Sequence, residues 1–231
     1  MNVLLVQNHE LVGPDMVEET LCRRDVPYVL AKSYSPKPLP APATFDAVMV
    51  FGSTASCRDL EAHAELLKTQ DLVAACVGLD KAVLGICFGG QLLAHILGAE
   101  VRPNDVGEYG CCQISLTSNG RRSLLFEGFP PTFPMIQYHG ETFGIPPAAG
   151  LLASSKHCRN QAFVSGRRVG LQFHLEASPQ TLSAWIEAYP GGPAKAGKTA
   201  EELLAECEQA AGEQSRLCDL FIGNFLKMAA E

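Results

Sequence analysis

The sequence has few of the features that mark exported, metal-binding or nucleic-acid-binding proteins. Its nine cysteines are odd in number and include no C-x-x-C pair, so neither a disulfide framework nor a zinc knuckle is indicated. Lys and Arg form no run and the net charge is -7, which disfavours a nucleic-acid or anionic membrane surface. The apolar stretch after Met1 is too short to cross a bilayer and lacks the basic flank of a signal peptide. We therefore expect a cytoplasmic protein with reduced thiols, no metal, no cofactor and a small-molecule partner.

The first half of the chain alternates between short apolar segments and amphipathic ones. With 231 residues, of which 47% are hydrophobic and 19% charged, the chain can bury a sizeable core, and we expect one domain over residues 1–231. Such alternation predicts an α/β fold with a flavodoxin-like, mostly parallel sheet flanked by helices. The expected strands are 3–6, 28–31, 47–51 and 82–86, and the expected helices are 14–22 and about 60–77.

The second half of the chain has a different sequence pattern. After Gly98, short strand-like pieces at 111–116, 161–164 and 169–173 are separated by Gly, Pro and Asn. Pieces of this length, without helices between them, are typical of antiparallel pairing. We therefore expect a small antiparallel second sheet.

Local signals mark several loops and helix ends. Proline at every second position of 36–42 predicts an extended surface connection. Ser178 before Pro179 is an N-cap signal, 199–202 forms a capping box, and 190–193 predicts a turn. The last helix is expected to pack Leu217, Phe221, Phe225 and Met228 against the sheet.

The most informative motif lies in the segment 82–94, where G-x-C-x-G is centred on Cys87. An apolar strand enters the motif and an amphipathic helix leaves it, which is the pattern of a nucleophile elbow. In such an elbow the reactive side chain lies on a strained turn, and small residues two positions away on either side avoid clashes. Gly85 and Gly89 meet that requirement.

Cys87 would lie at the N-terminus of the following helix, where the macrodipole and free backbone N–H groups favour a thiolate. The backbone N–H of Phe88 would point toward the same space and stabilise an oxyanion. Most cysteines between a strand and a helix are small buried apolar residues, and we interpret the other eight cysteines in that way. For Cys87 we hypothesise a nucleophile of acyl transfer.

A thiol nucleophile needs a histidine to take and return a proton, and the histidine needs a partner that fixes its tautomer. The segment 170–176 supplies both, because an apolar run ends in His174 and Glu176 follows two residues later. If the strand continues, the two side chains share one side of it. We therefore predict His174 as the base and Glu176 as its orienting group.

A second pair with the same spacing, His139 and Glu141, is a serious rival. The remaining histidines are poorer candidates because they lie in predicted helices, after the first strand or in a loop. His174 and Glu176 could also be an exposed pair at a strand end that contributes little to stability. The residues by themselves do not choose between His139 and His174.

The segments 85–94 and 172–176 resemble the cysteine motif and the histidine-glutamate motif of class I glutamine amidotransferases. The likeness is greatest to stand-alone relatives similar to the amidotransferase domain of GMP synthase, and it extends over nearly the whole chain. It favours His174 over His139. It implies that Cys87, His174 and Glu176 form a triad that hydrolyses the γ-amide of glutamine to glutamate and ammonia through a γ-glutamyl thioester.

The resemblance also implies roles for residues around the triad. Gln91, with the backbone around Gly140 and Glu141, would contact the amino and carboxylate end of a glutamyl substrate. The second oxyanion donor, beside Phe88, would come from the turn that contains Gly52 and Ser53. Departures from the family pattern occur at Ser53, Thr54, Gly90 and Leu175, and none of them removes a reacting group.

Two other functions share parts of this evidence. No synthetase domain or phosphate-binding loop is expected, so an ammonia acceptor would lie on a separate synthetase or acceptor subunit. The alternative enzyme is a γ-glutamyl peptide or conjugate hydrolase that uses the same triad with a different leaving amine. A binding or regulatory module with an inert or redox-sensing Cys87 would predict loss of His174 or Glu176, and both are present.

Overall fold

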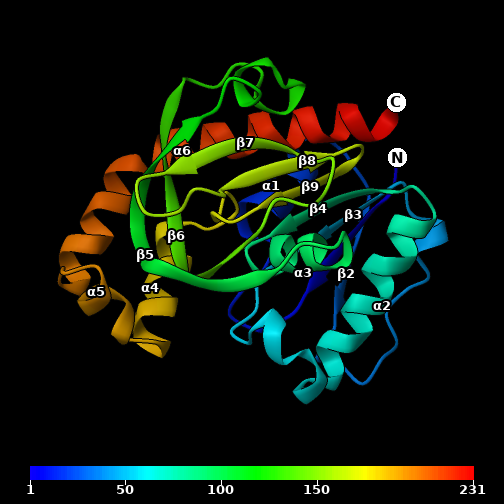
Figure 1. The fold of residues 1–231 in the computed structure, drawn as a ribbon, viewed down its shortest axis with the longest axis horizontal. Coiled ribbons are helices and arrows are strands. Elements are labelled where there is room, and N and C mark those ends of the chain that lie inside the picture. The colour runs from blue at the N-terminus through cyan, green and yellow to red at the C-terminus, as the bar shows by residue number, and fades with distance from the viewer.

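Nine strands form one continuous sheet in the structure, a computed structural model that describes residues 1–231 (Figure 1). Their order across the sheet is β2-β1-β3-β4-β9-β8-β7-β5-β6. The strands are β1 Val3–Gln7, β2 Tyr28–Lys32, β3 Ala47–Val50, β4 Ala82–Ile86, β5 Val101–Leu116, β6 Thr132–Phe143, β7 Gly150–Ser155, β8 Ala162–Ser165 and β9 Arg168–Leu171.

The parallel part of the sheet follows the prediction closely. The strands β2, β1, β3, β4 and β9 pair in parallel. The four strands expected in the first half occur, each within one residue of its predicted ends. Because β1 lies between β2 and β3, the chain reverses its winding direction there, and ligands of such sheets bind beyond the carboxyl ends of the strands.

The expected separate second sheet is wrong, and so is the expectation of a mostly parallel sheet. Strand β9 pairs in parallel with β4 on one side and antiparallel with β8 on the other, so it joins the two halves. Four pairings are parallel and four are antiparallel. The cause is the pairing of β4 with a strand more than eighty residues later, for which the local sequence carries no signal.

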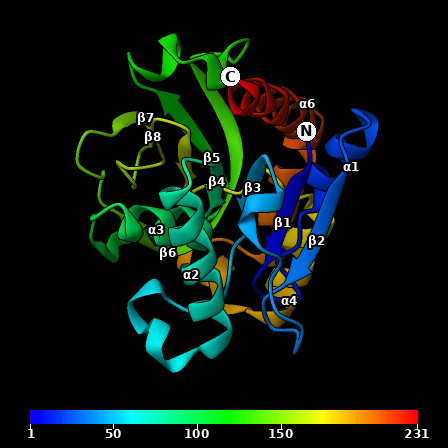
Figure 2. The same cartoon turned by 90° about the vertical axis from the view of Figure 1, so that its right-hand side faces the viewer.

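Helices cover both faces of the sheet (Figure 2). Helices α1 and α6 lie on one face, where they share a core cluster with β1, β3 and β4, and helices α2 and α3 lie on the other. The helices are α1 Asp15–Arg23, α2 Ala64–Gly78, α3 Phe88–Ile96, α4 Pro179–Ala188, α5 Gly191–Lys195 and α6 Ala200–Ala230.

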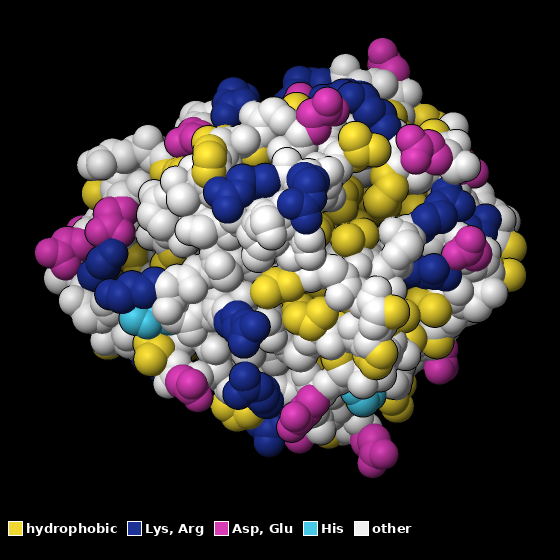
Figure 3. Space-filling model, turned by 45° about the horizontal axis from the view of Figure 1, so that its top comes forward, with side chains coloured by type: hydrophobic (Ala, Val, Ile, Leu, Met, Phe, Trp, Pro, Cys, Tyr) yellow, Lys and Arg dark blue, Asp and Glu magenta, His cyan; other side chains and the backbone are white.

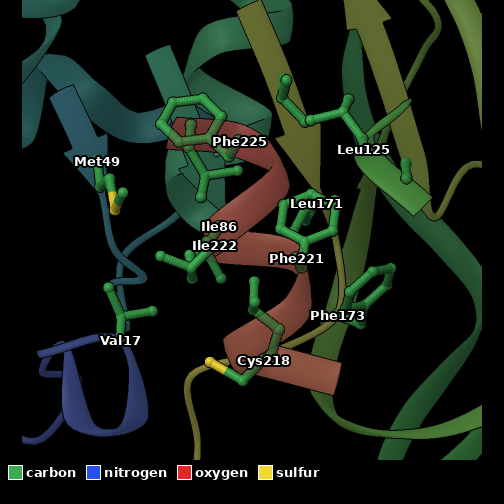
Figure 4. Packing of buried hydrophobic residues seen from close by; sticks show 14 of the residues in the cluster. Val17, Met49, Ile86, Leu125, Leu171, Phe173, Cys218, Phe221, Ile222 and Phe225 are labelled. Carbon is green, nitrogen blue, oxygen red and sulfur yellow. The ribbon is translucent and has the colours of Figure 1, made fainter. Parts of the chain in front are cut away.

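The long helix α6 packs against the sheet as predicted. Leu217, Phe221 and Phe225 are fully or almost fully buried in the largest core cluster, and Met228 packs against its edge. Figure 4 shows Phe221 and Phe225 beside residues of β3, β4 and β9. Full burial of one such side chain contributes about 1.5–3 kcal/mol to stability, so α6 helps to hold the parallel strands and the later strands together.

Helix boundaries agree with the local signals except at two places. Ser178 caps α4 and Thr199 begins α6 with a full capping box, as predicted. The expected helix 60–77 is divided, because the backbone leaves the helical region at His63 between a 3-10 segment and α2. The expected turn at 190–193 is wrong, since the short helix α5 begins there and proline is tolerated in a first helical turn.

No helix combines the length and the apolar character that a membrane span requires. On the face shown in Figure 3, Lys and Arg side chains and Asp and Glu side chains are both scattered over the surface.

Candidate active site

The turn between β4 and α3 has the strained geometry of a nucleophile elbow. Cys87 lies at its corner with φ 52° and ψ -109°, a conformation that costs free energy for any residue other than glycine. A Cβ atom on Gly85 would lie 2.2 Å from the carbonyl oxygen of Gly89, and one on Gly89 would lie 2.1 Å from that of Val50. The predicted requirement for small residues on both sides of Cys87 is confirmed.

Backbone groups surround the Cys87 side chain. Phe88 is the first residue of α3, so its N–H has no acceptor within the helix. A Cβ atom on Gly52 would lie 3.3 Å from Cε1 of His174 and 3.8 Å from Cβ of Cys87. The turn after β3, with Ser53 on the cavity wall, therefore passes directly beside both predicted reacting groups. Its contribution to an oxyanion hole stays a prediction.

The structure brings His174 and Glu176 together in a buried position. Nδ1 of His174 lies 2.7 Å from Oε1 of Glu176, and both side chains are almost completely excluded from solvent. The His174 ring also packs edge-on against Trp185, with ring centroids 4.6 Å apart. The Glu176 carboxylate and the Trp185 ring thus fix the imidazole, which faces the same cavity as Cys87.

The charge state of His174 follows from its surroundings. Burial by itself lowers the pKa of His174, but the Glu176 carboxylate and the adjacent Cys87 side chain outweigh burial and raise that pKa to about 10. The imidazole therefore keeps its proton at neutral pH. A positively charged imidazolium beside a sulfur atom favours negative charge on that sulfur.

The route by which His174 reaches the cavity differs from the prediction. The expected strand 169–173 is wrong at its end, because β9 stops at Leu171. His174 instead forms an isolated bridge in which its backbone N–H donates to the carbonyl oxygen of Ile136 at 2.9 Å. Contact with Glu176 thus comes from an irregular segment tied to β6 and not from a continued strand.

The rival pair of His139 and Glu141 does not form an analogous couple. Nδ1 of His139 lies 2.9 Å from the backbone carbonyl oxygen of Glu141. The Glu141 carboxylate instead accepts a hydrogen bond from Ser56 at 2.7 Å and pairs with Arg58 at 3.4 Å. The Glu141 carboxylate therefore does not orient the His139 ring.

His139 belongs to a different buried group. Its Nε2 lies 3.4 Å from Oε2 of Glu108, and one ligand atom each of Glu108, His139 and Cys158 lie within 4.8 Å of one another, a geometry that could hold a metal ion. The oxygens of Glu108 already accept hydrogen bonds from Ser155 and Gln161, both at 2.6 Å. Glu108 thus has hydrogen-bond partners of its own, and neither it nor Cys158 lines the cavity that contains Cys87 and His174.

A chain of amides connects Cys87 to the predicted substrate-binding segment. Nε2 of Gln172 lies 3.7 Å from Sγ of Cys87, while Nε2 of Gln91 donates to Oε1 of Gln172 at 3.2 Å and to the carbonyl oxygen of Glu141 at 3.3 Å. Gln172 was not among the predicted site residues. Gln172 lies two residues before His174, and in an extended chain side chains two residues apart point to the same side. This spacing was the signal in the sequence for Gln172.

Cys87, His174 and Gln91 line one cavity of about 650 Å³. One side, which we call the nucleophile wall, consists of Ser53, Cys87, Phe88, Gln91 and Glu141, so five of the predicted residues meet there. Gly140 also lines the cavity. A second set of lining residues, which we call the aromatic wall, consists of Tyr109, Tyr138, Trp185, Tyr189 and Lys195, none of which was predicted.

Residues 192–199 match the phosphate-loop pattern G-x-x-x-x-G-K-[ST], which corrects the expectation that the sequence contains none. A phosphate loop connects a strand to a helix, whereas this segment lies between α5 and α6. Lys198 pairs with Glu206 at 2.5 Å, and the Thr199 hydroxyl accepts a hydrogen bond from the N–H of Glu202. Both motif side chains therefore serve the start of α6.

Known proteins are similar to this chain in sequence and in fold. Residues 16–187 match the family Glutamine amidotransferase class-I. The chain is 31% identical over 166 residues to the glutamine amidotransferase-like protein YfeJ of Salmonella typhimurium, with 68% of each chain covered. It is 36% identical over 105 residues to the GMP synthase of Thermomicrobium roseum, covering 45% of this chain but only 19% of that protein.

A solved structure extends the likeness to the whole chain. The glutamine amidotransferase of Thermotoga maritima superimposes with a TM-score of 0.86 at 27% identity, and the match covers 100% of this chain and 99% of that one. The family match spans well over half of the sequence and includes the Cys87 elbow and the segment of His174 and Glu176. The chain belongs to the class I glutamine amidotransferase family.

Proposed function

We propose that this protein hydrolyses the γ-amide of glutamine to glutamate and ammonia, with Cys87 as nucleophile, His174 as acid and base, and Glu176 as the group that orients His174. One observation carries the proposal: the strained Cys87 and a carboxylate-bound, protonated His174 face the same cavity. Hydrolysis of an amide by a thiol requires these groups together.

The reaction proceeds in two balanced steps. The Cys87 thiolate attacks the γ-carbonyl carbon, and the N–H of Phe88 and the turn at Gly52 and Ser53 stabilise the oxyanion. The C–N bond then breaks while His174 gives its proton to the departing nitrogen, leaving a γ-glutamyl thioester. In the second step His174 takes a proton from water, the hydroxyl attacks the thioester carbon, and glutamate and the thiolate are released.

The other end of glutamine would lie along the rest of the nucleophile wall. The Glu141 carboxylate offers a negative charge for the α-ammonium group, and the backbone at Gly140 lies beside it. Gln91 holds the carbonyl oxygen of Glu141 and so supports this segment. We propose this orientation because it leaves the γ-amide between Cys87 and His174.

We further propose that any acceptor of the ammonia lies on another polypeptide. The GMP synthase of Thermomicrobium roseum extends far beyond the 19% of its length that this chain matches. No separate phosphate site is formed by 192–199 in this fold. We expect slow glutamine turnover by the isolated chain and faster turnover when a synthetase partner is bound.

Replacement of the nucleophile tests the proposal. Cys87→Ala should lower glutaminase kcat by at least about 10⁴-fold, because no other group can form the thioester. An electrophilic glutamine analogue should label Cys87 alone, as located by mass spectrometry. The matched control is Cys22→Ala, since Cys22 is exposed and lies outside the cavity. Full activity in the folded Cys87→Ala protein would end the proposal.

A further inference from the structure

We propose that the aromatic wall is a binding site for an aromatic amino acid as leaving group, so that γ-glutamyl dipeptides ending in Phe or Tyr are substrates. The inference rests on the proposed roles of Cys87 and His174, and it adds the identity of the amine that departs. Release of ammonia from glutamine needs no site beyond His174, whereas this cavity continues well past it.

The size of the cavity is the first argument. Its volume of about 650 Å³ lies in the range of roughly 300–1,000 Å³ that is typical of sites for larger organic ligands. A free glutamine bound with its α-amino end at Glu141 and its γ-amide at Cys87 fills only the nucleophile wall side. The space in front of the aromatic wall remains for a second group on the amide nitrogen.

The position of His174 gives the second argument, because the leaving nitrogen must lie next to its proton donor. The His174 ring is in contact with Trp185, at a centroid distance of 4.6 Å. A substituent on the leaving nitrogen therefore extends from His174 along Trp185 and toward Tyr138, whose ring lies 5.9 Å from that of Trp185. The path of a leaving amine is lined by aromatic rings.

The rings of this wall are held in fixed positions. Tyr138 meets Tyr109 edge to face at 5.2 Å, and its hydroxyl donates a hydrogen bond of 2.6 Å to the carbonyl oxygen of Tyr189. A Cβ atom on Gly192 would lie 2.3 Å from the Tyr138 hydroxyl oxygen, so α5 presses directly against the ring. Preorganised aromatic faces bind another aromatic ring through offset or edge contacts.

Charge supplies the third argument and identifies the leaving group as an amino acid. Lys195 lines the cavity beside Tyr109, with Nζ 5.4 Å from the ring centre of that residue. None of the ion pairs of the structure includes Lys195. The cavity is thus lined by both the Glu141 carboxylate and a free ammonium group. A γ-glutamyl dipeptide carries an α-ammonium for the first and a terminal carboxylate for the second.

The chemistry is the proposed hydrolysis with a different amine. Cys87 attacks the γ-carbonyl carbon of the dipeptide, the C–N bond breaks, and His174 protonates the amino group of the departing Phe or Tyr. Water then hydrolyses the γ-glutamyl thioester, so that one water is consumed and glutamate and one free amino acid are formed. No oxidant, nucleotide or other co-reactant is required.

A substrate series with the purified full chain tests the leaving-group site. We expect kcat/KM for γ-glutamyl-phenylalanine to exceed that for glutamine and for γ-glutamyl-glycine by at least about tenfold, because burial of the ring favours the transition state. The amide of phenethylamine, which has the ring but no carboxylate, should fall between them. Equal kcat/KM for all four compounds would overturn the inference and leave the proposed glutaminase intact.

Substitution of Lys195 separates the contribution of the substrate carboxylate from that of the substrate ring. In Lys195→Met the ratio of kcat/KM for γ-glutamyl-phenylalanine to that for γ-glutamyl-phenethylamide should fall about three- to fivefold, as expected for one partly exposed ion pair. Lys198→Met is the matched control, because Lys198 pairs with Glu206 outside the cavity, and it should leave the ratio unchanged. An unchanged ratio in Lys195→Met would show that Lys195 does not bind the carboxylate.

The series also distinguishes this inference from the function on which it rests. Hydrolysis of glutamine that is lost in Cys87→Ala, together with no preference for the dipeptide, contradicts only the leaving-group site. Absence of hydrolysis of every γ-glutamyl compound by the wild-type protein contradicts both.

Discussion

The nucleophile wall and the aromatic wall line one cavity but are built in different ways. The nucleophile wall is supported by backbone in close contact behind Cys87, at Gly85 and Gly89, where a single added carbon would collide with a carbonyl oxygen. The aromatic wall includes side chains from β5, β6, α4 and α5, and several of its rings touch one another. The position of Cys87 is therefore set by backbone contacts, whereas the aromatic wall is set by contacts between side chains.

After Cys87→Ala, a change of Glu176, which orients His174, should show the largest effect. Glu176→Gln removes the charge that raises the pKa of His174 to about 10, while the amide oxygen can still accept the Nδ1 hydrogen bond. We expect kcat at pH 8 to fall roughly 10²–10³-fold, because less of His174 carries the proton that the leaving nitrogen needs.

The pH dependence of kcat shows in which direction Glu176 shifts the pKa of His174. In the wild type, activity should be lost as the pH rises through about 10, where His174 gives up its proton. In Glu176→Gln this alkaline limb should move to lower pH, since the loss of a nearby negative charge disfavours the imidazolium. An alkaline limb at the same pH in both proteins would mean that another group limits the reaction.

A pair of glycine substitutions compares the packing of the two sides. Gly89→Ala should destabilise the protein by about 1–3 kcal/mol or more, because the new methyl group meets the backbone of Val50 and cannot move it. Gly191→Ala, in α5 beside the aromatic wall, should change stability by less than about 0.5 kcal/mol, since no atom lies within 4 Å of the added carbon. Urea unfolding measures both, and equal losses would refute the contrast between the walls.

The smallest predicted effect concerns the hydrogen bond that holds the Tyr138 ring of the aromatic wall in place. Tyr138→Phe deletes the hydrogen bond to the carbonyl oxygen of Tyr189 but keeps the ring, so we expect a loss of about 0.5–1.5 kcal/mol in the free energy of unfolding. Tyr34→Phe is the control, because Tyr34 is exposed on a loop. Should both variants unfold at the same denaturant concentration, the hydroxyl of Tyr138 contributes nothing to the wall.

Local contacts explain why much of the parallel half could be predicted. Strands β1 to β4 each follow a short connection or helix, and their apolar segments are visible without knowledge of their neighbours. The caps at Ser178 and Thr199 depend on hydrogen bonds to residues three positions away. Such signals are contained in a few consecutive residues, and the structure agrees with them.

Non-local contacts explain the errors. The place of β9 between β4 and β8 depends on strand pairing across most of the chain, and it turned an expected second sheet into a continuation of the first. The residues 190–193 look like a turn, but packing of Gly192 on Tyr138 accompanies a short helix there. The local sequence of neither segment predicts its outcome.

The sequence by itself determined the elbow at Cys87, because the glycines that permit the turn and the helix that follows it are neighbours along the chain. Only the tertiary structure decided which histidine lies against that cysteine and which rings close the cavity. The physical reason is that His174, Trp185 and Tyr138 come together through the pairing of β4 with β9 and the packing of α4 and α5, which are contacts between residues distant in the sequence.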